Sequence, residues 1–350
     1  MNFIYCFASF RENKNQISNV HSLVIYLKGG IGDFFMLLPT VEAIKQNSKI
    51  KVHLFIPSEI KIIAEKYSYF ESIVGTKTSK NKLSERIKSV FIEHKAFSEI
   101  KYQLLFVPPV GSNLVLCFLG LFIRKKIFVG FSNSDCSNFF NYLMKFSDQP
   151  IIVQNSQLLI LLGIQSLIKI PDLPFLSSDC KTYPEASRKK LKEQEKVIIA
   201  LYLFTYQNGN SKAAFNIKGY SDLIKELNSY SNNYLFILLG GEKDAAACED
   251  VIKELNEKVS INKLAEHSSI FQNASLVSKS KAIIGIDGGF MHVIQWIDVK
   301  KITLWNGTNF LHYGYESENN LNIHVEKYRF HNYDYNIGAI GKEIYEFICK

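Results

Sequence analysis

Two stretches of the sequence place an aspartate where an apolar run meets glycine. In LVIYLKGGIGDFFMLLP, residues 23–39, Asp33 follows a glycine-rich turn. In AIIGIDGGFMHVIQW, residues 282–296, Asp287 precedes Gly288 and Gly289, and His292 follows three residues later. A carboxylate beside a bound substrate can act as a general base, and the free N–H groups at a helix start bind phosphate. The two stretches therefore predict an acid–base group and an anion site.

Each of these side chains also has a purely structural interpretation. Asp33 can cap the helix that follows it, which stabilises a protein by about 0.5–2 kcal/mol, and its position alone favours that role. Asp287 can likewise be a cap, and His292 can be a hydrogen-bonded histidine of the core. Chemistry at these positions therefore needs support from the rest of the chain.

Known phosphate-binding loops do not fit the first stretch. After Gly30 and Gly32, the third position of a GxGxxG dinucleotide motif is Phe35, whose ring would prevent close packing of helix on strand. The chain also lacks the GxxxxGK[ST] pattern of a P-loop. Both motif classes are thereby excluded.

A polar segment in the second half adds candidates for an anion site. The stretch TYQNGNSKAAF, residues 205–215, places Thr205, Ser211 and Lys212 in a predicted loop between a strand and a helix. A lysine there can pair with phosphate as a point charge, although most loop lysines are only solvated.

The elements that carry these residues alternate between short β-branched runs and longer amphipathic ones, which predicts βα units and parallel sheets. The pattern occurs twice, so two α/β domains are expected, and open parallel sheets bind ligands at the carboxyl ends of their strands. The expected strands are 23–27, 51–56, 102–107, 126–131, 196–203, 234–240, 281–286 and 301–305, with helices at 35–46, 218–229, 242–256, 268–279 and 289–297.

The domain boundaries follow from composition. We expect a leader over residues 1–21, a first domain over 22–170, and a linker over 171–196 that is rich in proline, serine and charge. A second domain then covers 197–336, and a last helix covers 337–350. A chain of 350 residues exceeds the limit of about 250–300 residues for one core, which agrees with two domains.

Composition narrows the environment and the partners. The formal charge of +8 permits an anionic partner such as a nucleotide, a phosphorylated glycan or a membrane face. The six cysteines include no CxxC pair, so neither a zinc site nor a disulfide framework is indicated, and a reducing cytosol fits best. The first residues have no basic lead and only a short apolar run, which argues against a signal peptide.

One further segment has the composition of a membrane contact. The run 114–123, LVLCFLGLFI, is followed by Arg124, Lys125 and Lys126. It is shorter than the roughly 20 residues that a membrane span needs. It is therefore expected to form a buried helix, with a surface resting on anionic lipid as the alternative.

Four segments in order resemble glycosyltransferase family 9, the ADP-heptose-dependent lipopolysaccharide heptosyltransferases and their relatives. They are GDFFMLLP (32–39), KAAFNIKGYSDL (212–223), LFILLGGE (235–242) and GIDGGFMHV (285–293), and the resemblance runs from about residue 22 to about 315. The chain departs from the family pattern at several sites: Lys212 lies one residue further from Phe215 than the usual lysine does from tryptophan, and the His-Pro-Gly turn is missing around LYLFTYQ (201–207). Phe215 and Asn216 stand where Trp-Pro is usual, Gly288 where Ser or Thr is usual, and Asn306 and Gly307 in place of Gly-Pro.

The resemblance implies a GT-B fold: two Rossmann-like α/β domains with parallel sheets facing a central cleft. It places the acceptor on the first domain, by the loop of Gly30 and Gly32, and the nucleotide-sugar donor on the second. It makes Asp33 the general base of an inverting transfer that needs no metal and no cofactor. The implied donor and diphosphate residues are Thr205, Ser211, Lys212, Glu242, Asp287, Gly288, Gly289 and His292, with Glu242 toward the ribose.

The expected reaction moves heptose or a related sugar, with ADP-heptose as the expected donor, to a bacterial surface glycan such as lipopolysaccharide core. The expected partners are the nucleotide sugar and a glycan or glycolipid acceptor, with no nucleic acid. The expected location is the cytoplasm, with peripheral contact at the inner membrane as an option. In GT-B relatives the last helix often returns to the first domain, and the spacing of Ile340, Ile344 and Phe347 fits that or a plain packing helix.

Two alternatives stay open at this point. A transferase of the same fold could modify a protein such as an adhesin instead of a glycolipid. A degenerate protein could bind a nucleotide sugar without turnover, which the altered donor segments would explain. An NAD-dependent enzyme is disfavoured by Phe35.

Overall fold

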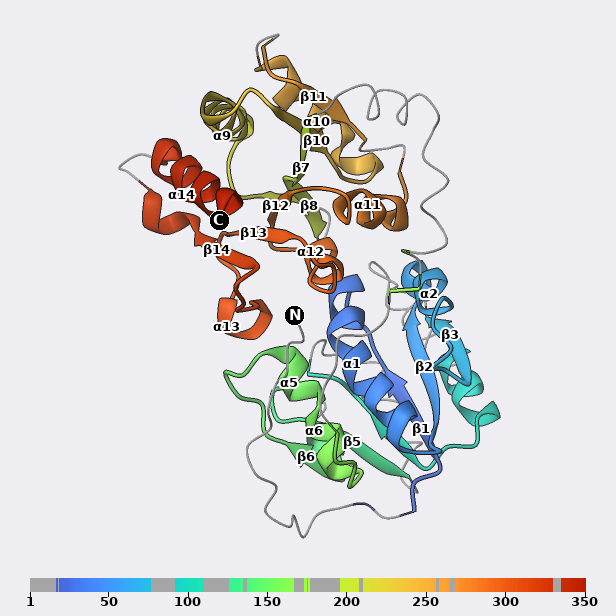
Figure 1. Ribbon diagram of the computed structural model, residues 1–350. Helices are drawn as coiled ribbons and strands as arrows, with labels where there is room; N and C mark the ends of the chain where they lie inside the picture. Colours follow the sequence, from blue (N-terminus) through green and yellow to red (C-terminus); the bar gives the residue numbers. More distant parts are fainter. Residues whose placement is uncertain are drawn as a thin grey trace. The chain divides into compact units, whose positions relative to one another are not determined.

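The computed structural model shows two α/β units, Met1–Asp172 and Leu173–Lys350 (Figure 1). It describes residues 17, 19–76, 92–109, 126–134, 137–166, 173–174, 176, 196–207, 210–255, 258–264, 268–329 and 335–350. The apolar run 114–123, nearly all of the leader and most of the linker lie outside these residues. Among the described helices, none is both long and apolar enough to cross a membrane.

The first unit is built on a six-stranded sheet in the order β3-β2-β1-β4-β5-β6. Every pair in it is parallel, with Leu23 of β1 opposite Leu104 on one side and Val52 on the other. The strands are β1 (Ser22–Tyr26), β2 (Lys51–Pro57), β3 (Ser72–Thr76), β4 (Leu104–Phe106), β5 (Ile127–Phe131) and β6 (Tyr142–Met144). The central strands β1 and β4 are buried throughout, as expected of a parallel sheet covered on both faces.

The helices of the first unit follow the strands in sequence. They are α1 (Ile31–Asn47), α2 (Ser58–Ala64), a helical segment 92–99, the short 3₁₀ turn η1 (Ser137–Phe139), α5 (Ile151–Asn155) and α6 (Gln157–Leu161). Helix α1 packs against α5 and α6, and Asn155 of α5 donates a hydrogen bond to the carbonyl of Met36 (3.1 Å). The predicted helix 35–46 is confirmed, although it begins four residues earlier.

The second unit repeats the plan with the order β11-β10-β7-β12-β13-β14, again entirely parallel. Its sheet strands are β7 (Val197–Tyr202), β10 (Tyr234–Leu238), β11 (Ile261–Lys263), β12 (Ala282–Ile286), β13 (Lys300–Trp305) and β14 (Asn320–His324). A separate antiparallel hairpin joins β8 (Phe204–Gln207) to β9 (Asn210–Ala213). All eight predicted strands of the two units are confirmed, while the edge strands β3, β6, β11 and β14 were not predicted.

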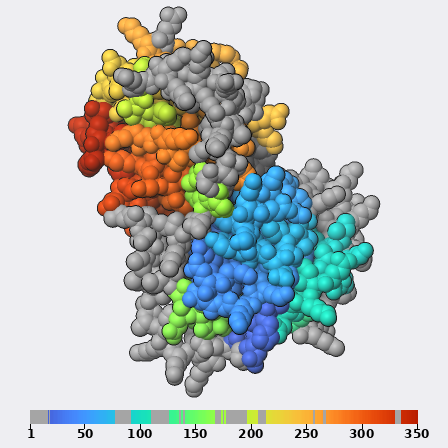
Figure 2. Space-filling model, turned by 45° about the vertical axis from the view of Figure 1, so that its right-hand side comes forward, coloured from blue at the N-terminus to red at the C-terminus, as the bar shows by residue number. Residues whose placement is uncertain are grey.

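The second unit contains all of its predicted helices, with bounds that differ slightly from the predicted ones. Its helices are α9 (Ile217–Tyr230), η2 (Glu242–Asp244), α10 (Ala245–Lys253), α11 (Ile270–Val277), α12 (Gly289–Ile294), α13 (Phe310–Tyr313), η3 (Val325–Tyr328) and α14 (Ile337–Cys349). In Figure 2 the orange and red atoms, which belong to the C-terminal part of the chain, form one continuous body.

Both sheets have the strand order of a Rossmann fold when the strands of each unit are numbered along the chain, 3-2-1-4-5-6. In this order successive strands are added toward one edge up to the third strand and toward the other edge from the fourth, so the switch point lies between the first and fourth strands. These are β1 and β4 in one unit and β7 and β12 in the other. Ligands bind beyond the carboxyl ends of the strands at this switch point. The sequence Gly29–Asp33 follows β1, and Asp287 follows β12, so both stretches lie at such a point. That the two sheets face a central cleft stays a prediction.

The last helix is an integral part of the second unit. Helix α14 packs alongside α9 and contacts β14 (Figure 1). Ile340, Ile344 and Ile348 are fully or almost fully buried in the core of that unit. These contacts within the second unit are those of a packing helix, and the return of this helix to the first domain stays a prediction.

Truncation of α14 in the core should therefore destabilise the protein. Ile344→Ala removes a fully buried side chain, and we expect it to lower the free energy of unfolding by about 2–5 kcal/mol. Lys342→Ala, on the exposed side of the same helix, should change it by less than about 0.5 kcal/mol. Urea denaturation of both variants measures the difference, and equal losses would show that α14 does not contribute to this core.

Candidate functional site

Asp33 is the third residue of α1 and closes the start of that helix. Gly30 is the N-cap in an extended conformation, and its N–H donates to Asp33 Oδ2 at 2.6 Å. This bond satisfies one of the backbone donors around the start of the helix. The capping interpretation of Asp33 is thereby confirmed.

The same environment changes the acidity of Asp33. Burial raises the pKa of its carboxyl from 3.8 to about 6, against the opposing effect of backbone hydrogen bonds from Gly30 and Asp33 itself. The side chain still keeps a partly exposed surface. A carboxylate with a pKa near neutrality is a better proton acceptor than an ordinary aspartate and is still mainly ionised at pH 7. Capping and general-base chemistry are therefore compatible at this position.

Gly29 makes room for the carboxylate. A Cβ atom at Gly29 would come far closer to Asp33 Oδ2 than the 3.0 Å limit that real Cβ atoms respect, whereas one at Gly30 would lie 3.8 Å away. Gly32 is buried in the first turn of α1. The acceptor-side role of Gly30 and Gly32 stays a prediction, and Gly29 is a residue that the motif comparison missed. The sequence does show Gly29, as the first of the glycines in the turn before Asp33.

A buried ion pair lies just before this turn. Lys28 follows β1, and its Nζ is 2.7 Å from Glu93 Oε1, with both side chains largely buried. The hydroxyl of Tyr26 donates to the other oxygen of Glu93. Glu93 thus joins the helical segment 92–99 to the end of β1 and balances the charge of Lys28.

In the second unit, β12 leads directly into a helix start. The N–H of Asp287 donates to the carbonyl of Leu304 on β13 (3.3 Å), Gly288 is the N-cap, and α12 begins at Gly289. The first N–H groups of a helix have no partner within it. Asp287, Gly288 and Gly289 are all partly exposed. The structure thus places backbone donors at the position where the sequence predicts an anion site.

Thr205 lies against this helix start. A Cβ atom at Gly288 would meet Thr205 Oγ1 at 3.0 Å and Thr205 Cβ at 3.2 Å. The hydroxyl of Thr205 therefore fills the space beside the N-cap that a side chain at position 288 would occupy. Two predicted site residues from separate segments of the sequence are brought together here.

The segment carrying Thr205 is a hairpin, which corrects the predicted loop. Thr205 of β8 pairs with Lys212 of β9, and the two residues between the strands are Asn-Gly, a dipeptide typical of tight hairpins. The buried hydroxyl of Tyr220 closes the hairpin base, donating to the carbonyl of Leu203 and accepting from the N–H of Ala214, both at 2.7 Å. The side chains of Ser211 and Lys212 are outside the described part of the structure, so their predicted roles are untested.

His292 is a buried and neutral member of the site. Its Nε2 lies 3.8 Å from Asp287 Oδ1, and its Nδ1 lies 3.3 Å from the hydroxyl of Tyr315. Burial lowers the pKa of the imidazole to about 4. His292 can therefore offer a hydrogen bond, but not a positive charge, at neutral pH.

The predicted ribose contact, Glu242, is exposed, while the buried acid nearby is Asp244. Asp244 Oδ2 accepts from the N–H of Gly241 at 2.9 Å, and its buried Oδ1 has no partner in the described part of the chain. Burial raises the pKa of the Asp244 carboxyl. The signal missed in the sequence is a repeated Gly-x-x-Asp pattern, since Gly241 and Asp244 are spaced like Gly30 and Asp33.

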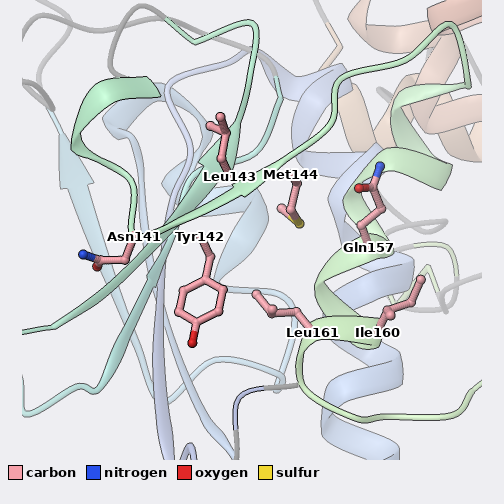
Figure 3. A pocket seen from close by; sticks show the side chains of 7 residues that line it. All are labelled: Asn141, Tyr142, Leu143, Met144, Gln157, Ile160 and Leu161. Carbon is pink, nitrogen blue, oxygen red and sulfur yellow. The ribbon is translucent and has the colours of Figure 1, made fainter. Parts of the chain in front are cut away.

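The first unit contains a hollow that is lined by none of these residues. It has a volume of about 410 Å³ beside the edge strand β6 and helix α6. Figure 3 shows the side chains that line it, which are Asn141, Tyr142, Leu143, Met144, Gln157, Ile160 and Leu161. None of the predicted site residues is among them. In the described residues, no group of three or more His, Cys, Asp or Glu side chains is arranged to hold a metal ion.

The fold and these helix starts define a class: two Rossmann-like units whose shared strand order places polar turns at the switch points, as in nucleotide-dependent enzymes. The profile described as glycosyltransferase family 9 (heptosyltransferase) matches residues 116–336. The chain belongs to this family and is a glycosyltransferase.

Individual relatives agree with this assignment. The chain is 23% identical over 310 residues to lipopolysaccharide heptosyltransferase 3 of Escherichia coli, with 85% of this chain and 87% of the relative covered. It shares its fold with E. coli ADP-heptose lps heptosyltransferase II, with a TM-score of 0.68 and 16% identity over 94% of this chain and 98% of the other. For E. coli heptosyltransferase WaaC with ADP the TM-score is 0.67 and the identity 15%, with 93% of this chain and 99% of the other covered. The GT-B fold is thereby confirmed.

The close approach at Gly29 generates a prediction for Asp33. In Gly29→Ala the added methyl group would overlap the carboxylate. We expect the carboxylate to leave its buried position, so that the pKa of Asp33 falls from about 6 toward its ordinary value. Gly30→Ala adds the same methyl group with only an ordinary contact to Oδ2 and should leave the pKa near 6. Carboxyl ¹³C NMR titration of the two variants measures the effect. The same titration in both would contradict the proposed crowding.

Proposed function

We propose that the protein is an inverting, metal-independent transferase that moves heptose from ADP-heptose to a lipopolysaccharide-type glycan. The observation that carries this proposal is the carboxyl of Asp33, which stands at the switch point of the first sheet with its pKa raised to about 6. Support for the donor comes from the relatives, one named an ADP-heptose transferase and one solved with ADP. Support for the acceptor comes from the name of the curated relative.

In the proposed reaction Asp33 removes the proton from an acceptor hydroxyl. The hydroxyl oxygen attacks the anomeric carbon from the face opposite the leaving group, and the bond from that carbon to the diphosphate oxygen breaks. The electron pair leaves with the nucleoside diphosphate, and the anomeric configuration inverts. Asp33 supplies the proton acceptor, so the rate depends on its ionised form.

The leaving diphosphate gains negative charge, which the second unit is suited to stabilise. The N–H groups at the start of α12 are fixed dipoles that need no reorganisation during the reaction. The hydroxyl of Thr205 lies beside them, and we assign Ser211 and Lys212 of β9 to the same diphosphate. His292 contributes a neutral donor, and Asp287 holds the turn. These groups act in place of a metal ion and require no further cofactor.

We assign the ribose contact to Asp244 in place of Glu242. A buried carboxylate oxygen without a partner is costly and is satisfied when a ligand hydroxyl donates to it. Asp244 Oδ1 fulfils this description among the described residues, whereas Glu242 is solvated. Asp244 also follows β10, the strand next to β7 in the sheet.

Removal of the base tests the mechanism. Asp33→Asn should lower kcat by roughly 10²–10⁴-fold and leave ADP affinity unchanged. For the wild type, kcat/KM should rise with pH through about 6 and then level off, because only the ionised carboxylate accepts the proton. Glu65→Gln, the same carboxylate-to-amide change at the end of α2, is the control. Activity of Asp33→Asn within tenfold of wild type would leave Asp33 with its capping role alone.

The ribose assignment has its own test. Asp244→Asn should weaken ADP binding by about tenfold or more, since a hydrogen bond to a charged group contributes about 1.5–3 kcal/mol. Glu242→Gln should bind ADP like the wild type. Calorimetric titration of both variants measures the two affinities, and a loss confined to Glu242→Gln would restore the assignment made from the sequence.

A further inference from the structure

His292 is held by two polar groups that approach opposite nitrogens of its ring. The carboxylate oxygen Oδ1 of Asp287 lies 3.8 Å from Nε2, and the hydroxyl of Tyr315 lies 3.3 Å from Nδ1. His292 and Tyr315 are both buried. The ring is neutral at pH 7 because burial lowers its pKa to about 4, so it carries one proton on one of the two nitrogens.

The two neighbours favour the same tautomer: Asp287 favours a proton on Nε2, and Tyr315 favours a bare Nδ1. A carboxylate is only an acceptor, so a bare Nε2 would direct its lone pair at a negatively charged oxygen. A phenol hydroxyl can donate as well as accept, so a bare Nδ1 finds a donor in Tyr315. The arrangement with the lowest electrostatic energy therefore has the proton on Nε2 and the hydroxyl of Tyr315 donating to Nδ1. The bond made by one ring nitrogen sets the tautomer at the other.

Tyr315 is itself held in place by hydrogen bonds to its carbonyl and by a ring contact. Its carbonyl accepts from the side-chain amides of Asn322 (2.9 Å) and Asn320 (3.3 Å), both on β14. Asn322 Oδ1 accepts from the indole N–H of Trp305 at the end of β13 (3.0 Å). The amide of Asn320 also donates to Gln295 (3.0 Å), the C-cap of the helix that carries His292. The ring of Trp296 meets that of Tyr315 edge to face, with the centroids 6.2 Å apart.

We infer that Tyr315 is a positioning residue for His292: it keeps the imidazole proton on Nε2, on the side of Asp287 at the start of α12. The imidazole then presents a fixed, neutral N–H donor beside the predicted diphosphate site. That use of the donor rests on the proposed function, whereas the tautomer itself does not. The hydrogen bonds of Asn320, Asn322 and Trp305 fix the backbone of Tyr315 and so hold its hydroxyl beside the imidazole of His292.

The tautomer can be read directly in the unliganded protein. Histidine-selective ¹⁵N labelling with long-range NMR correlation distinguishes a protonated from a bare ring nitrogen, and the spectrum of His292→Asn identifies the signals of His292. We expect a neutral ring at pH 7 with the proton on Nε2. In Tyr315→Phe the Nδ1 signal should move to that of a nitrogen without a hydrogen bond. A proton on Nδ1 in the wild type, or an unchanged Nδ1 signal in the variant, would overturn the inference.

The consequence for binding is measured with ADP. Tyr315→Phe should weaken ADP binding by about tenfold, the loss expected when one buried hydrogen bond is removed. Tyr230→Phe, which removes an exposed hydroxyl on α9 that bonds Glu226, should bind as the wild type does. A purely structural role of Tyr315 would lower the unfolding temperature while leaving the His292 spectrum unchanged, and would overturn the inference. If the His292 spectrum shows the expected tautomer but ADP binds neither the wild type nor Tyr315→Phe, the tautomer assignment is supported and the proposed donor is wrong.

Discussion

The parallel pairing of all strands in both sheets is the constraint on which the site depends. It brings the carboxyl ends of neighbouring strands to one edge, and the 3-2-1-4-5-6 order separates the turns that follow the first and fourth strands. In the first unit, the segment after the first strand, β1, carries Asp33. In the second unit, the turn after the fourth strand, β12, carries Asp287 and Gly288. Residues far apart in the sequence, such as Thr205 and Gly288, come into contact for this reason.

Both units use the same local device to bury a carboxylate. A glycine N-cap donates its N–H to an aspartate three residues later, at Gly30 with Asp33 and at Gly241 with Asp244. The backbone bond and the positive end of the helix offset part of the cost of burial. Burial nevertheless dominates and raises the pKa of both carboxyl groups. The device thus places one buried carboxylate near a helix start in each unit; under the proposed function these are the base and the acceptor for a ligand hydroxyl.

The sequence predicted the central strands and helices well because their hydrophobic periods are long and regular, as in β1, β10 and α9. It missed edge strands such as β6, since three residues give no reliable period, and it took the β8–β9 hairpin for a loop although Asn-Gly marks a tight turn. Asp33 and Asp287 could be selected from local pattern. For Asp244 the repeated Gly-x-x-Asp pattern was a signal that was missed, but that its Oδ1 has no partner among the described residues emerges only after folding. The contact of Tyr315 with His292 likewise exists only in the folded chain.

Under the proposed function, the second unit binds an adenosine diphosphate sugar without a metal ion. The most direct test of this claim is calorimetric titration of the purified protein with ADP, UDP, GDP and CMP, each with EDTA and with added Mg²⁺. We expect ADP to bind most tightly, with the same affinity in EDTA and in Mg²⁺. Tighter binding of UDP or GDP, binding that requires Mg²⁺, or binding of no nucleotide would contradict the claim.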